Sequence, residues 1–508
     1  MPRRTTLSNL PADRPGLSQL IFFALGGAAT LAFAPFGAYL LVPLLLLPIF
    51  HVCLTLAPRD AAKHAFWFGF GLFLSGTYWI YISVVVYGNA PAWIAFFLML
   101  GLVLIMSTYF GLMGWVIGRL SAGEPWALLA VAPAAWVVIE WLRGWAFTGF
   151  PWMALGYSQI DTALAGWAPL LGVYGVSLLL VVSVASLLIA ILERGRRRLL
   201  AIAVVLLPWI VGAGLSTLQW TQADGEVINT TLIQAGVPQE RKWLAEEREP
   251  TKDFYRERTQ GAADSKLVIW PEVAIPSVSD REETYIRSLQ QISQRNAQTI
   301  VFGILEREYV SANESRIYNS VIAINGQQRE VYRKRHLVPF GEYFPVPSFV
   351  RNWMRMMSLP FSDLTPGADE QALLSTAGGT RLTVAICYED SYGAEMLYAM
   401  PEAGLIVNVS NDAWFGDSIA PHQHLQIARM RSLEVGRESV RATNTGISAF
   451  IDARGRVRAT GAQFEAVEMS MDVQPRSGMT PYARFGNWPV ISLCLLVIGG
   501  FWLRSRSS

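Results

Sequence analysis

Residues 168–192 read APLLGVYGVSLLLVVSVASLLIAIL, a run without a single charged side chain. A helix of about 20 apolar residues is long enough to cross the ~30 Å hydrocarbon core of a bilayer. The run therefore predicts a membrane-spanning helix, and similar apolar windows recur along the chain. They fall at residues 17–34, 38–57, 65–87, 91–118, 125–142, 168–192, 199–218 and 485–503, which predicts eight spans.

Charge is distributed unevenly between the two halves of the chain. Charged residues make up 16% of the 508 residues, against about 25% in average soluble domains. Of the 39 acidic residues, those before residue 220 are Asp13, Asp60, Glu124, Glu140, Asp161 and Glu193. We therefore predict seven transmembrane helices in residues 1–218, a water-soluble domain in 219–484, and an eighth helix with a short tail in 485–508.

Basic residues in short loops predict the orientation, because Lys and Arg remain on the cytoplasmic side. The loops and ends that carry them are those with Arg3, Arg4 and Arg14, Arg59 and Lys63, Arg119, Arg194 to Arg198, and Arg504 and Arg506. Both termini are thus expected in the cytoplasm. The domain at 219–484 is expected on the far side, which in a bacterium is the periplasm, beside the inner membrane.

Two features near the end of the fifth window need separate interpretation. Glu140 is an ionisable residue in an apolar window, which suggests either a functional group or an ion pair with Arg143 one turn away. The segment 143–163 is aromatic and rich in Gly and Pro, and is expected at the membrane interface beneath the soluble domain.

Several partner and cofactor classes lack a signal. The formal net charge is +2 and no basic face is present, so no nucleic-acid partner is expected. The spacing of His422 and His424, with no Cys nearby, does not favour a metal site. There is no phosphate-cradling Gly-Lys motif, so we expect no cofactor. The soluble half has no apolar heptad pattern, and we expect a monomer.

Short β-rich runs recur in the soluble half. They lie at 230–234, 266–270, 299–303, 321–324, 382–386, 405–409 and 446–451, and helix-like polar stretches lie at 280–297 and 422–440. Strands that alternate with helices predict an α/β domain. The predicted fold class is therefore α plus α/β.

Three sites in this half carry residues suited to catalysis. Cys387 ends a strand-like run and could be either a nucleophile or a small core residue. Glu272 follows another strand, directly after Trp270-Pro271, and could be either a general base or a carboxylate near a helix start. Lys334 precedes a Pro-Phe-Gly turn and Glu342, where it would stabilise an oxyanion or belong to a solvated basic turn.

Taken together, these motifs resemble a known family. The order Trp270-Pro271-Glu272, then Lys334-x-His336-Leu-Val-Pro-Phe-Gly341-Glu342, then Cys387-Tyr388-Glu389 resembles the nitrilase superfamily. Joined to an N-terminal helical bundle, it is similar to the bacterial apolipoprotein N-acyltransferase family over nearly the whole chain. The resemblance implies an αββα sandwich near residues 225–470, outside the membrane and inserted before the last helix.

The resemblance also implies roles for individual residues. Glu272 would be the general base, Lys334 would stabilise the oxyanion, and Cys387 would be the nucleophile. Glu342 and Glu389 would support them. Trp152, Trp243 and Tyr388 would contribute to substrate entry or gating, although each could equally have a packing role. The segment from Asn408 to Asp412, with Ser410 and Asn411, would form a wall of the site, although it could also be a simple turn.

The implied reaction has two lipid substrates. A phospholipid would donate an acyl chain to Cys387, and the α-amino group of a diacylglyceryl-cysteine at the start of an apolipoprotein would accept it. A membrane-tethered amidase is a second hypothesis, although one anchor would suffice for it. A transporter or receptor is a third, for which more charged residues within the spans would be expected. His336 also permits a Cys-His dyad, but the complete Lys-x-His motif favours Lys334.

Overall fold

The computed structural model describes residues 15–88, 90–311, 314–343 and 363–507. By their internal contacts the residues form two compact units, Met1–Leu218 with Asn487–Ser508, and Gln219–Gly486. We call them the helical unit and the sheet unit. The basic residues expected before the first span, Arg3, Arg4 and Arg14, lie outside the described residues.

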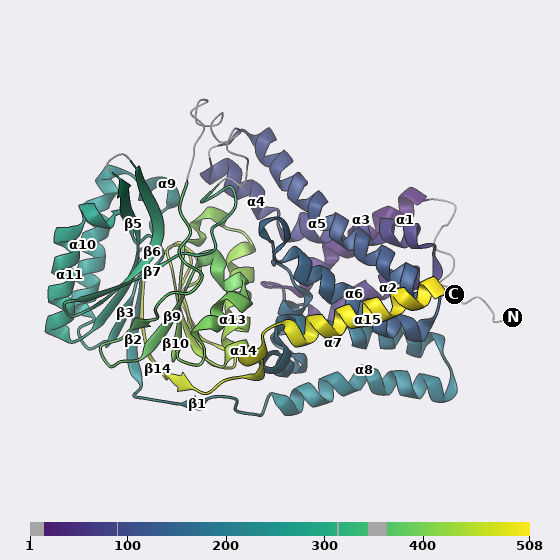
Figure 1. Cartoon of the computed structure of the whole chain (residues 1–508). Helices are drawn as coiled ribbons and strands as arrows, with labels where there is room; N and C mark the ends of the chain where they lie inside the picture. Colours follow the sequence, from purple (N-terminus) through teal and green to yellow (C-terminus); the bar gives the residue numbers. More distant parts are fainter. Residues whose placement is uncertain (1–14, 89, 312–313, 344–362, 508) are drawn as a thin grey trace. The chain divides into compact units, whose positions relative to one another are not determined.

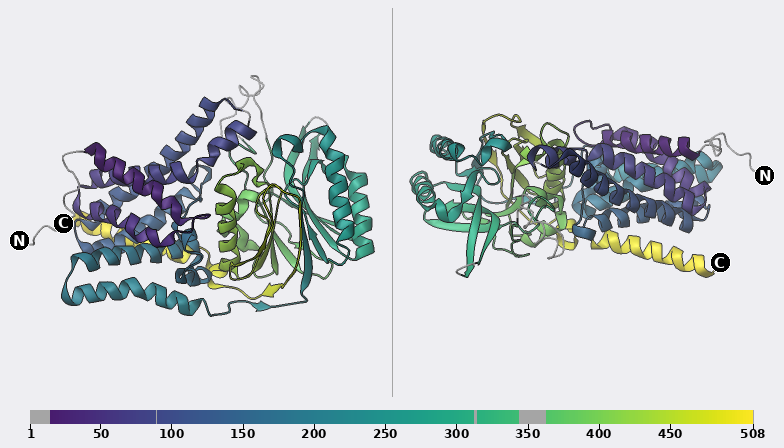
Figure 2. Two further views of the ribbon diagram at one scale, coloured as in Figure 1. Left: turned by 180° about the vertical axis from the view of Figure 1, so that it is seen from behind. Right: turned by 90° about the horizontal axis from the view of Figure 1, so that it is seen from above.

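The helical unit is built from apolar helices that run alongside one another (Figures 1 and 2). Pro58 and Pro125 start two of them, because proline at a first helical position loses no hydrogen bond. Every predicted apolar window overlaps a helix. The main helices are α1 (Pro15–Ala29), α2 (Val42–Thr55), α3 (Pro58–Gly76), α4 (Trp79–Ile82), α5 (Ala92–Ser121), α6 (Pro125–Arg143), α7 (Ala168–Leu192), α8 (Gly195–Leu215) and α15 (Trp488–Ser507).

Helix lengths support fewer spans than the sequence predicts. In the described part of the chain, five helices are long and apolar enough to cross a membrane: α5, α6, Ala163–Leu192, α8 and Trp488–Arg506. The window 65–87 is broken, because Pro58–Gly76 and Trp79–Tyr87 meet at a bend of 47° and form at most one further span. The first two windows form shorter apolar helices. A membrane protein with several apolar helices is confirmed, whereas the count of eight is not.

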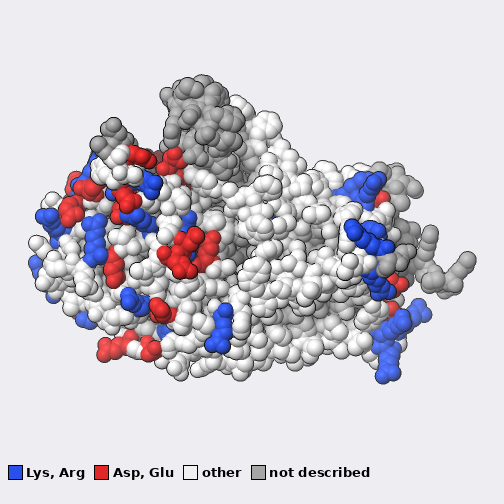
Figure 3. Space-filling model, viewed as in Figure 1, with Lys and Arg blue, Asp and Glu red and all other residues white. Residues whose placement is uncertain are grey.

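The surface of the helical unit fits a lipid environment. Figure 3 shows a broad uncharged band along these helices, with Lys and Arg gathered at one end. Large apolar side chains such as Leu44, Trp93 and Phe97 are exposed within this unit. The basic residues of the short loops, including Arg59, Lys63 and Arg119, are exposed as well. An apolar surface bounded by charge is what a bilayer requires.

Glu140 and Arg143 both bind the loop that follows α6. Glu140 Oε1 accepts hydrogen bonds from the Trp136 indole at 2.8 Å and from the main-chain nitrogen of Leu155 at 2.7 Å. Arg143 donates to a main-chain oxygen of that loop, the carbonyl of Trp152, at 2.6 Å. These buried polar groups therefore fix the path of the aromatic loop, a role the sequence did not indicate.

The sheet unit contains two large mixed sheets. One has the order β13-β12-β11-β10-β9-β8, and the other has β14-β2-β3-β5-β6-β7 with β4 paired to β5. Their bounds are β2 (Ile228–Gln234), β3 (Leu267–Ile269), β4 (Ile275–Val278), β5 (Thr299–Ser311), β6 (Glu314–Asn325), β7 (Gln328–Arg333), β8 (Leu374–Ser375), β9 (Arg381–Ile386), β10 (Leu405–Ser410), β11 (Glu438–Thr443), β12 (Ala449–Ile451), β13 (Val457–Thr460) and β14 (Val467–Val473). A separate small ribbon pairs β1 (Gln222–Ala223) with β15 (Arg476–Ser477).

The two sheets pack face to face around one buried core. Leu232 and Val301 from one sheet join Val384 and Val407 from the other in the same apolar cluster. Helices α10 (Ala245–Gly261) and α11 (Glu283–Asn296) cover the outer face of the sheet with β5 (Figure 1), and α13 (Ala420–Val435) covers the outer face of the other sheet. The central strands are buried on both faces, which explains why their sequences read as continuous apolar runs.

The seven predicted β-rich runs overlap β2, β3, β5, β6, β9, β10 and β12, and the predicted helical stretch 280–297 contains α11. Most of the helix-like stretch 422–440 belongs to α13, but α13 ends at Val435 and Glu438 already begins β11. Gly436 has φ +64°, a left-handed conformation that closes a helix and that glycine adopts without strain. Six strands of the two large sheets were not anticipated: β4, β7, β8, β11, β13 and β14.

Parallel strands place several polar residues at one edge. β3 runs parallel to β5 in one sheet, and β9 runs parallel to β10 in the other. The carboxyl end of β3 leads to Glu272, that of β9 to Cys387, and that of β10 to Ser410 and Asn411. Carboxyl ends of parallel strands are where α/β folds form their sites.

Candidate active site

Glu272 lies in a tight turn after β3 and is 6% exposed. Its Oε1 accepts a hydrogen bond from Asn319 Nδ2 at 2.7 Å and lies 3.4 Å from Lys334 Nζ. Lys242 Nζ donates to the main-chain oxygen of Glu272 at 3.2 Å. Burial lowers the pKa of Lys242 and outweighs the charge of Glu272, which raises it, so that the pKa is about 8. The carboxylate is thus held from two sides.

Lys334 follows β7 and is 1% exposed. Its Nζ is 2.9 Å from Glu342 and 3.4 Å from Glu272, so two carboxylates share one ammonium group. Burial alone lowers the pKa of Lys334, but the charges of Glu342 and Glu272 outweigh it and raise the pKa. The side chain therefore stays charged across the physiological range. Glu342 is itself fixed by the main-chain nitrogen of Val338 at 2.8 Å.

Cys387 stands at the junction of β9 and the 3₁₀ helix η9 (Cys387–Ser391). Its φ is +51°, which for a residue with a side chain is a strained, left-handed conformation found most often at functional positions. Burial raises the pKa of the Cys387 thiol, Glu272 raises it further, and Lys334 opposes them. The resting group is consequently a thiol that needs a base as it reacts.

Among the contacts of the described residues, the Glu389 carboxylate makes no hydrogen bond or ion pair with the side chains of Glu272, Lys334 and Cys387. Its Oε1 accepts a hydrogen bond from the main-chain nitrogen of Arg335 at 2.6 Å, and its Oε2 accepts one from that of Ile386 at 2.7 Å. The Tyr332 hydroxyl donates to both oxygens at 3.1 Å. Burial raises the pKa of Glu389, although these main-chain hydrogen bonds lower it.

Asn319 on β6 was not identified from the sequence. Its Nδ2 donates to Glu272 at 2.7 Å and to Glu342 at 2.9 Å, so one amide positions both carboxylates. The only available signal was the polar pair Asn319-Ser320, directly before the apolar run 321–324 of β6. That signal was too general, because such a residue is as often on a solvent-facing side of a strand.

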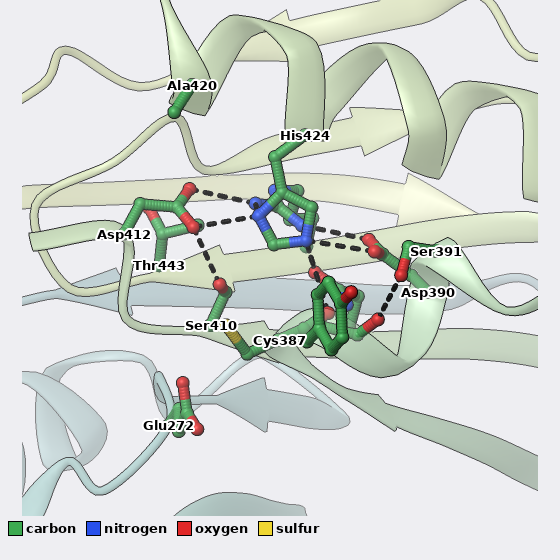
Figure 4. Close-up of polar contacts among 12 residues, drawn as sticks. Glu272, Cys387, Asp390, Ser391, Ser410, Asp412, Ala420, His424 and Thr443 are labelled. Atoms are coloured by element: carbon green, nitrogen blue, oxygen red, sulfur yellow. Dashed lines mark hydrogen bonds and ion pairs between the residues drawn. The ribbon is translucent and has the colours of Figure 1, made fainter. Parts of the chain in front are cut away.

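A second polar network lies on the other side of Cys387 from Glu272 (Figure 4). The Ser410 hydroxyl donates to Asp412 Oδ1 at 2.8 Å, and His424 Nδ1 lies 2.8 Å from the same oxygen. Sequence reasoning placed Asp412 only in a possible site wall and considered His424 only as a metal ligand. The structure brings both close to the thiol.

The remaining predicted residues are spread over both units. Trp152 belongs to the helical unit, where it is buried and packs against Trp79 with ring centroids 5.4 Å apart. Trp243 follows the short helix α9 (Gln239–Lys242) and is half exposed. The Tyr388 ring contacts His336 edge to face at 5.8 Å. Asn411 Nδ2 donates to Gln239 at 2.8 Å, which ties the end of β10 to α9.

No group of His, Cys, Asp and Glu suited to holding a metal ion occurs among the described residues. The charges of the site are instead balanced by Lys334 and Arg441. A buried thiol, a carboxylate beside it and a permanently charged lysine have the composition needed for nucleophilic acyl transfer.

Two known families match this chain, one within each unit. The family described as the apolipoprotein N-acyltransferase N-terminal domain matches residues 25–186, and the carbon-nitrogen hydrolase family matches residues 232–477. The second match confirms a nitrilase-like fold for the sheet unit.

Full-length relatives agree with these matches. The apolipoprotein N-acyltransferase of Methylococcus capsulatus is 42% identical over 480 residues, which is 94% of each chain. Those of Nitrosomonas europaea and Pseudomonas syringae pv. tomato are each 38% identical, over 94% and 97% of this chain and 96% and 98% of their own.

Proposed function

The chain belongs to the apolipoprotein N-acyltransferase family, and we propose that Glu272, Lys334 and Cys387 carry out its acyl transfer through a thioester. One observation carries the proposal: the buried Lys334 ammonium lies 3.4 Å from Glu272, and its charge lowers the pKa of the Cys387 thiol against the effects of burial and of Glu272. A base, a fixed cation and a nucleophile thus meet at one edge of the sheets.

In the first half-reaction, Glu272 takes the thiol proton while Cys387 attacks the ester carbonyl of a phospholipid. The carbon–sulfur bond forms, the carbon–oxygen bond to glycerol breaks, and Glu272 returns the proton to the leaving oxygen, which gives a lysophospholipid. Since the pKa of Cys387 is raised, proton removal accompanies attack instead of preceding it. Lys334 stabilises the developing oxyanion.

In the second half-reaction, the neutral α-amino group of a diacylglyceryl-cysteine attacks the thioester. The carbon–nitrogen bond forms and the carbon–sulfur bond breaks. Glu272 takes a proton from the attacking nitrogen and delivers it to the sulfur, which restores the thiol. The product is an N-acylated lipoprotein, and the phospholipid and the apolipoprotein bind in turn.

The supporting residues act through these three. Glu342 orients the Lys334 ammonium, and Glu389 fixes the main chain next to Lys334 and Cys387. We assign substrate entry and binding to Trp152, Trp243, Tyr388, Ser410 and Asn411. Trp243 supports this by its exposure, since a half-exposed indole is suited to contact with an acyl chain.

We further propose that all eight apolar windows span the inner membrane of a bacterium. The αββα catalytic domain, residues 219–484, then lies in the periplasm between helices 1–7 of residues 1–218 and the helix of residues 485–508, and both termini are cytoplasmic. Exposed arginines gathered at one end of the helical unit support this orientation (Figure 3). Substrates with two or more acyl chains remain in the bilayer, so the enzyme, as a monomer, works at its surface.

A coupled assay tests the function. The purified chain in mixed micelles receives a phospholipid and a diacylglyceryl-cysteinyl peptide, and both lysophospholipid and N-acylated peptide are measured. Equal amounts of the two products are expected from the wild type and from Cys494→Ala, and none from Cys387→Ala. Lysophospholipid with free fatty acid and no acylated peptide would contradict the acyltransferase and support a hydrolase.

A further inference from the structure

A cluster of charged side chains is buried behind Cys387 and has no part in the acyl transfer described above. It comprises Asp390 on η9, Asp412 on η11 (Asp412–Phe415), His424 on α13 and Arg441 on β11, none of them more than 1% exposed. In Figure 4, Asp390, Asp412 and His424 of this cluster lie on the opposite side of Cys387 from Glu272. Burying four charged groups is costly unless they are mutually paired.

His424 is placed between the two carboxylates of the cluster. Its Nδ1 lies 2.8 Å from Asp412 Oδ1, and its Nε2 lies 2.9 Å from Asp390 Oδ1. An imidazole can donate from both nitrogens only as the imidazolium. Arg441 Nη2 is 2.9 Å from Nδ1, but it also lies 2.8 Å from Asp412 Oδ2, which offers it an acceptor. Two cations facing two carboxylates make the cluster neutral.

The cluster reaches the nucleophile by two routes. His424 Nε2 lies 3.1 Å from the main-chain oxygen of Cys387, the residue with the left-handed backbone. The second route is the hydroxyl of Ser410, which donates to Asp412 Oδ1 at 2.8 Å, lies beside Cys387 (Figure 4) and lowers the pKa of its thiol. His424 is therefore connected both to the backbone and to the reacting atom.

Ser410 has one hydroxyl proton and faces two acceptors. While Cys387 is a thiol, the stronger acceptor is Asp412. When the thiol loses its proton or when the thioester breaks, the sulfur carries negative charge and competes for the same hydroxyl. The outcome depends on how much negative charge Asp412 presents, which the imidazolium of His424 reduces.

We propose that His424 is a positioning residue for the nucleophile. As an imidazolium, His424 offsets the charge of Asp412, so that the Ser410 hydroxyl can turn to the Cys387 sulfur whenever that sulfur becomes negative. The proton stays on Ser410 throughout, so the turn changes only its hydrogen-bond acceptor. The inference rests on the proposed function, because it assigns Ser410 and His424 to both half-reactions.

The protonation of His424 agrees with this assignment. Burial and Arg441 lower the pKa of His424, but Asp390 and Asp412 outweigh them and raise it to about 9. The same pairing keeps the pKa of Asp412 below its usual range, although burial by itself raises it. Near neutral pH the cluster thus holds an imidazolium between two carboxylates, and it loses that charge as the pH rises through about 9.

Alkylation of Cys387 by iodoacetamide tests the proposal without any lipid. The background is the full chain with Cys53→Ala and Cys494→Ala, which leaves one cysteine of three. Ser410→Ala and His424→Gln are each expected to slow alkylation about 10- to 100-fold at pH 8, because each removes one hydrogen bond to a charged sulfur. The double variant is expected to be no slower than the slower single one, since both act on one proton.

His422→Gln is the matched control, because His422 lies on the same helix but its imidazole is paired with Gln463, at 3.5 Å, and not with the buried cluster. Its alkylation rate should equal that of the background chain. Multiplied effects in the double variant, or a His424→Gln rate equal to that of His422→Gln, would overturn the proposal. A wild type that alkylates in this manner but forms no acyl-enzyme would refute the proposed function and leave the network intact.

The pH profile gives a readout that does not require His424→Gln to fold. In the background chain the alkylation rate should rise with pH and flatten near pH 9, where His424 loses its proton and Asp412 retains the hydroxyl. In Ser410→Ala this flattening should disappear. Identical profile shapes in the two proteins would contradict the role given to the hydroxyl.

Discussion

The Glu389 carboxylate accepts a hydrogen bond from the main-chain nitrogen of Arg335 at 2.6 Å. Its other oxygen accepts one from Ile386 at 2.7 Å. Arg335 follows Lys334 and Ile386 precedes Cys387, so a single buried carboxylate joins the two segments that carry the cation and the nucleophile. Glu389 thereby sets the spacing of catalytic groups that it does not touch.

Glu389→Gln should consequently impair both stability and catalysis. An amide presents an N–H group to at least one main-chain N–H, which leaves buried donors facing each other at a cost of about 1–3 kcal/mol. We expect a lower Tm and an acylation rate reduced by about 100-fold or more. Thermal unfolding and lysophospholipid release measure these effects. An unchanged Tm with full activity would contradict the bracing role.

Asn319→Ala should weaken catalysis by releasing two carboxylates at once. The amide donates to Glu272 at 2.7 Å and to Glu342 at 2.9 Å, and hydrogen bonds to charged groups contribute about 1.5–3 kcal/mol each. A fall in kcat of about 100-fold is expected, with KM for phospholipid little changed. Asn325→Ala, at the far end of β6, serves as the control. A KM effect alone would assign Asn319 to substrate binding.

Gly303→Ala tests the rigidity of the Glu272 turn from a position outside the site. A Cβ at Gly303 would lie 2.7 Å from Glu272 Cα and from the main-chain oxygen of Pro271, so the turn would have to shift. Activity should fall at least about tenfold, since small displacements of catalytic groups are costly. Gly261→Ala is the control, because no atom lies within 4 Å of its added Cβ. Equal activities would show that the turn adapts.

The buried imidazolium makes stability dependent on pH in a defined direction. The pKa of His424 rises from 6.5 to about 9 on folding. Its stabilising contribution is therefore complete below pH 6.5 and is lost as the pH rises through 9. Between these values the Tm of the wild type should fall more than that of His424→Gln, while His422→Gln follows the wild type. Parallel curves for wild type and His424→Gln would show that His424 is not charged in the fold.

Much of the architecture was predictable from local pattern. Apolar windows fixed the membrane assignment, and apolar runs such as 382–386 and 405–409 predicted buried strands, since both signals depend on neighbours in sequence. Span counting was less successful, because the bend between Gly76 and Trp79 interrupts a window that reads as continuous. The helical prediction over 422–440 extended too far, because the left-handed residue Gly436 ends α13.

Contacts between distant segments explain what the sequence could not show. Glu272, Lys334 and Cys387 were proposed from motifs, whereas Asn319 and the Asp412–His424 pair have no motif of their own. Their roles arise only when β6, η11 and α13 bring side chains together across long separations in sequence. Glu389 was expected to assist the other carboxylates, yet its described hydrogen bonds go to main-chain groups and to Tyr332.

The thioester on Cys387 can be observed by intact mass spectrometry of the purified chain after incubation with a defined phospholipid. We expect a mass increase of one acyl chain on the wild type. This increase should be absent from Cys387→Ala, strongly reduced in Glu272→Gln, and discharged by a diacylglyceryl-cysteinyl peptide. An acyl adduct of equal size on Cys387→Ala, or a wild type that releases lysophospholipid without ever carrying the acyl chain, would contradict the thioester mechanism.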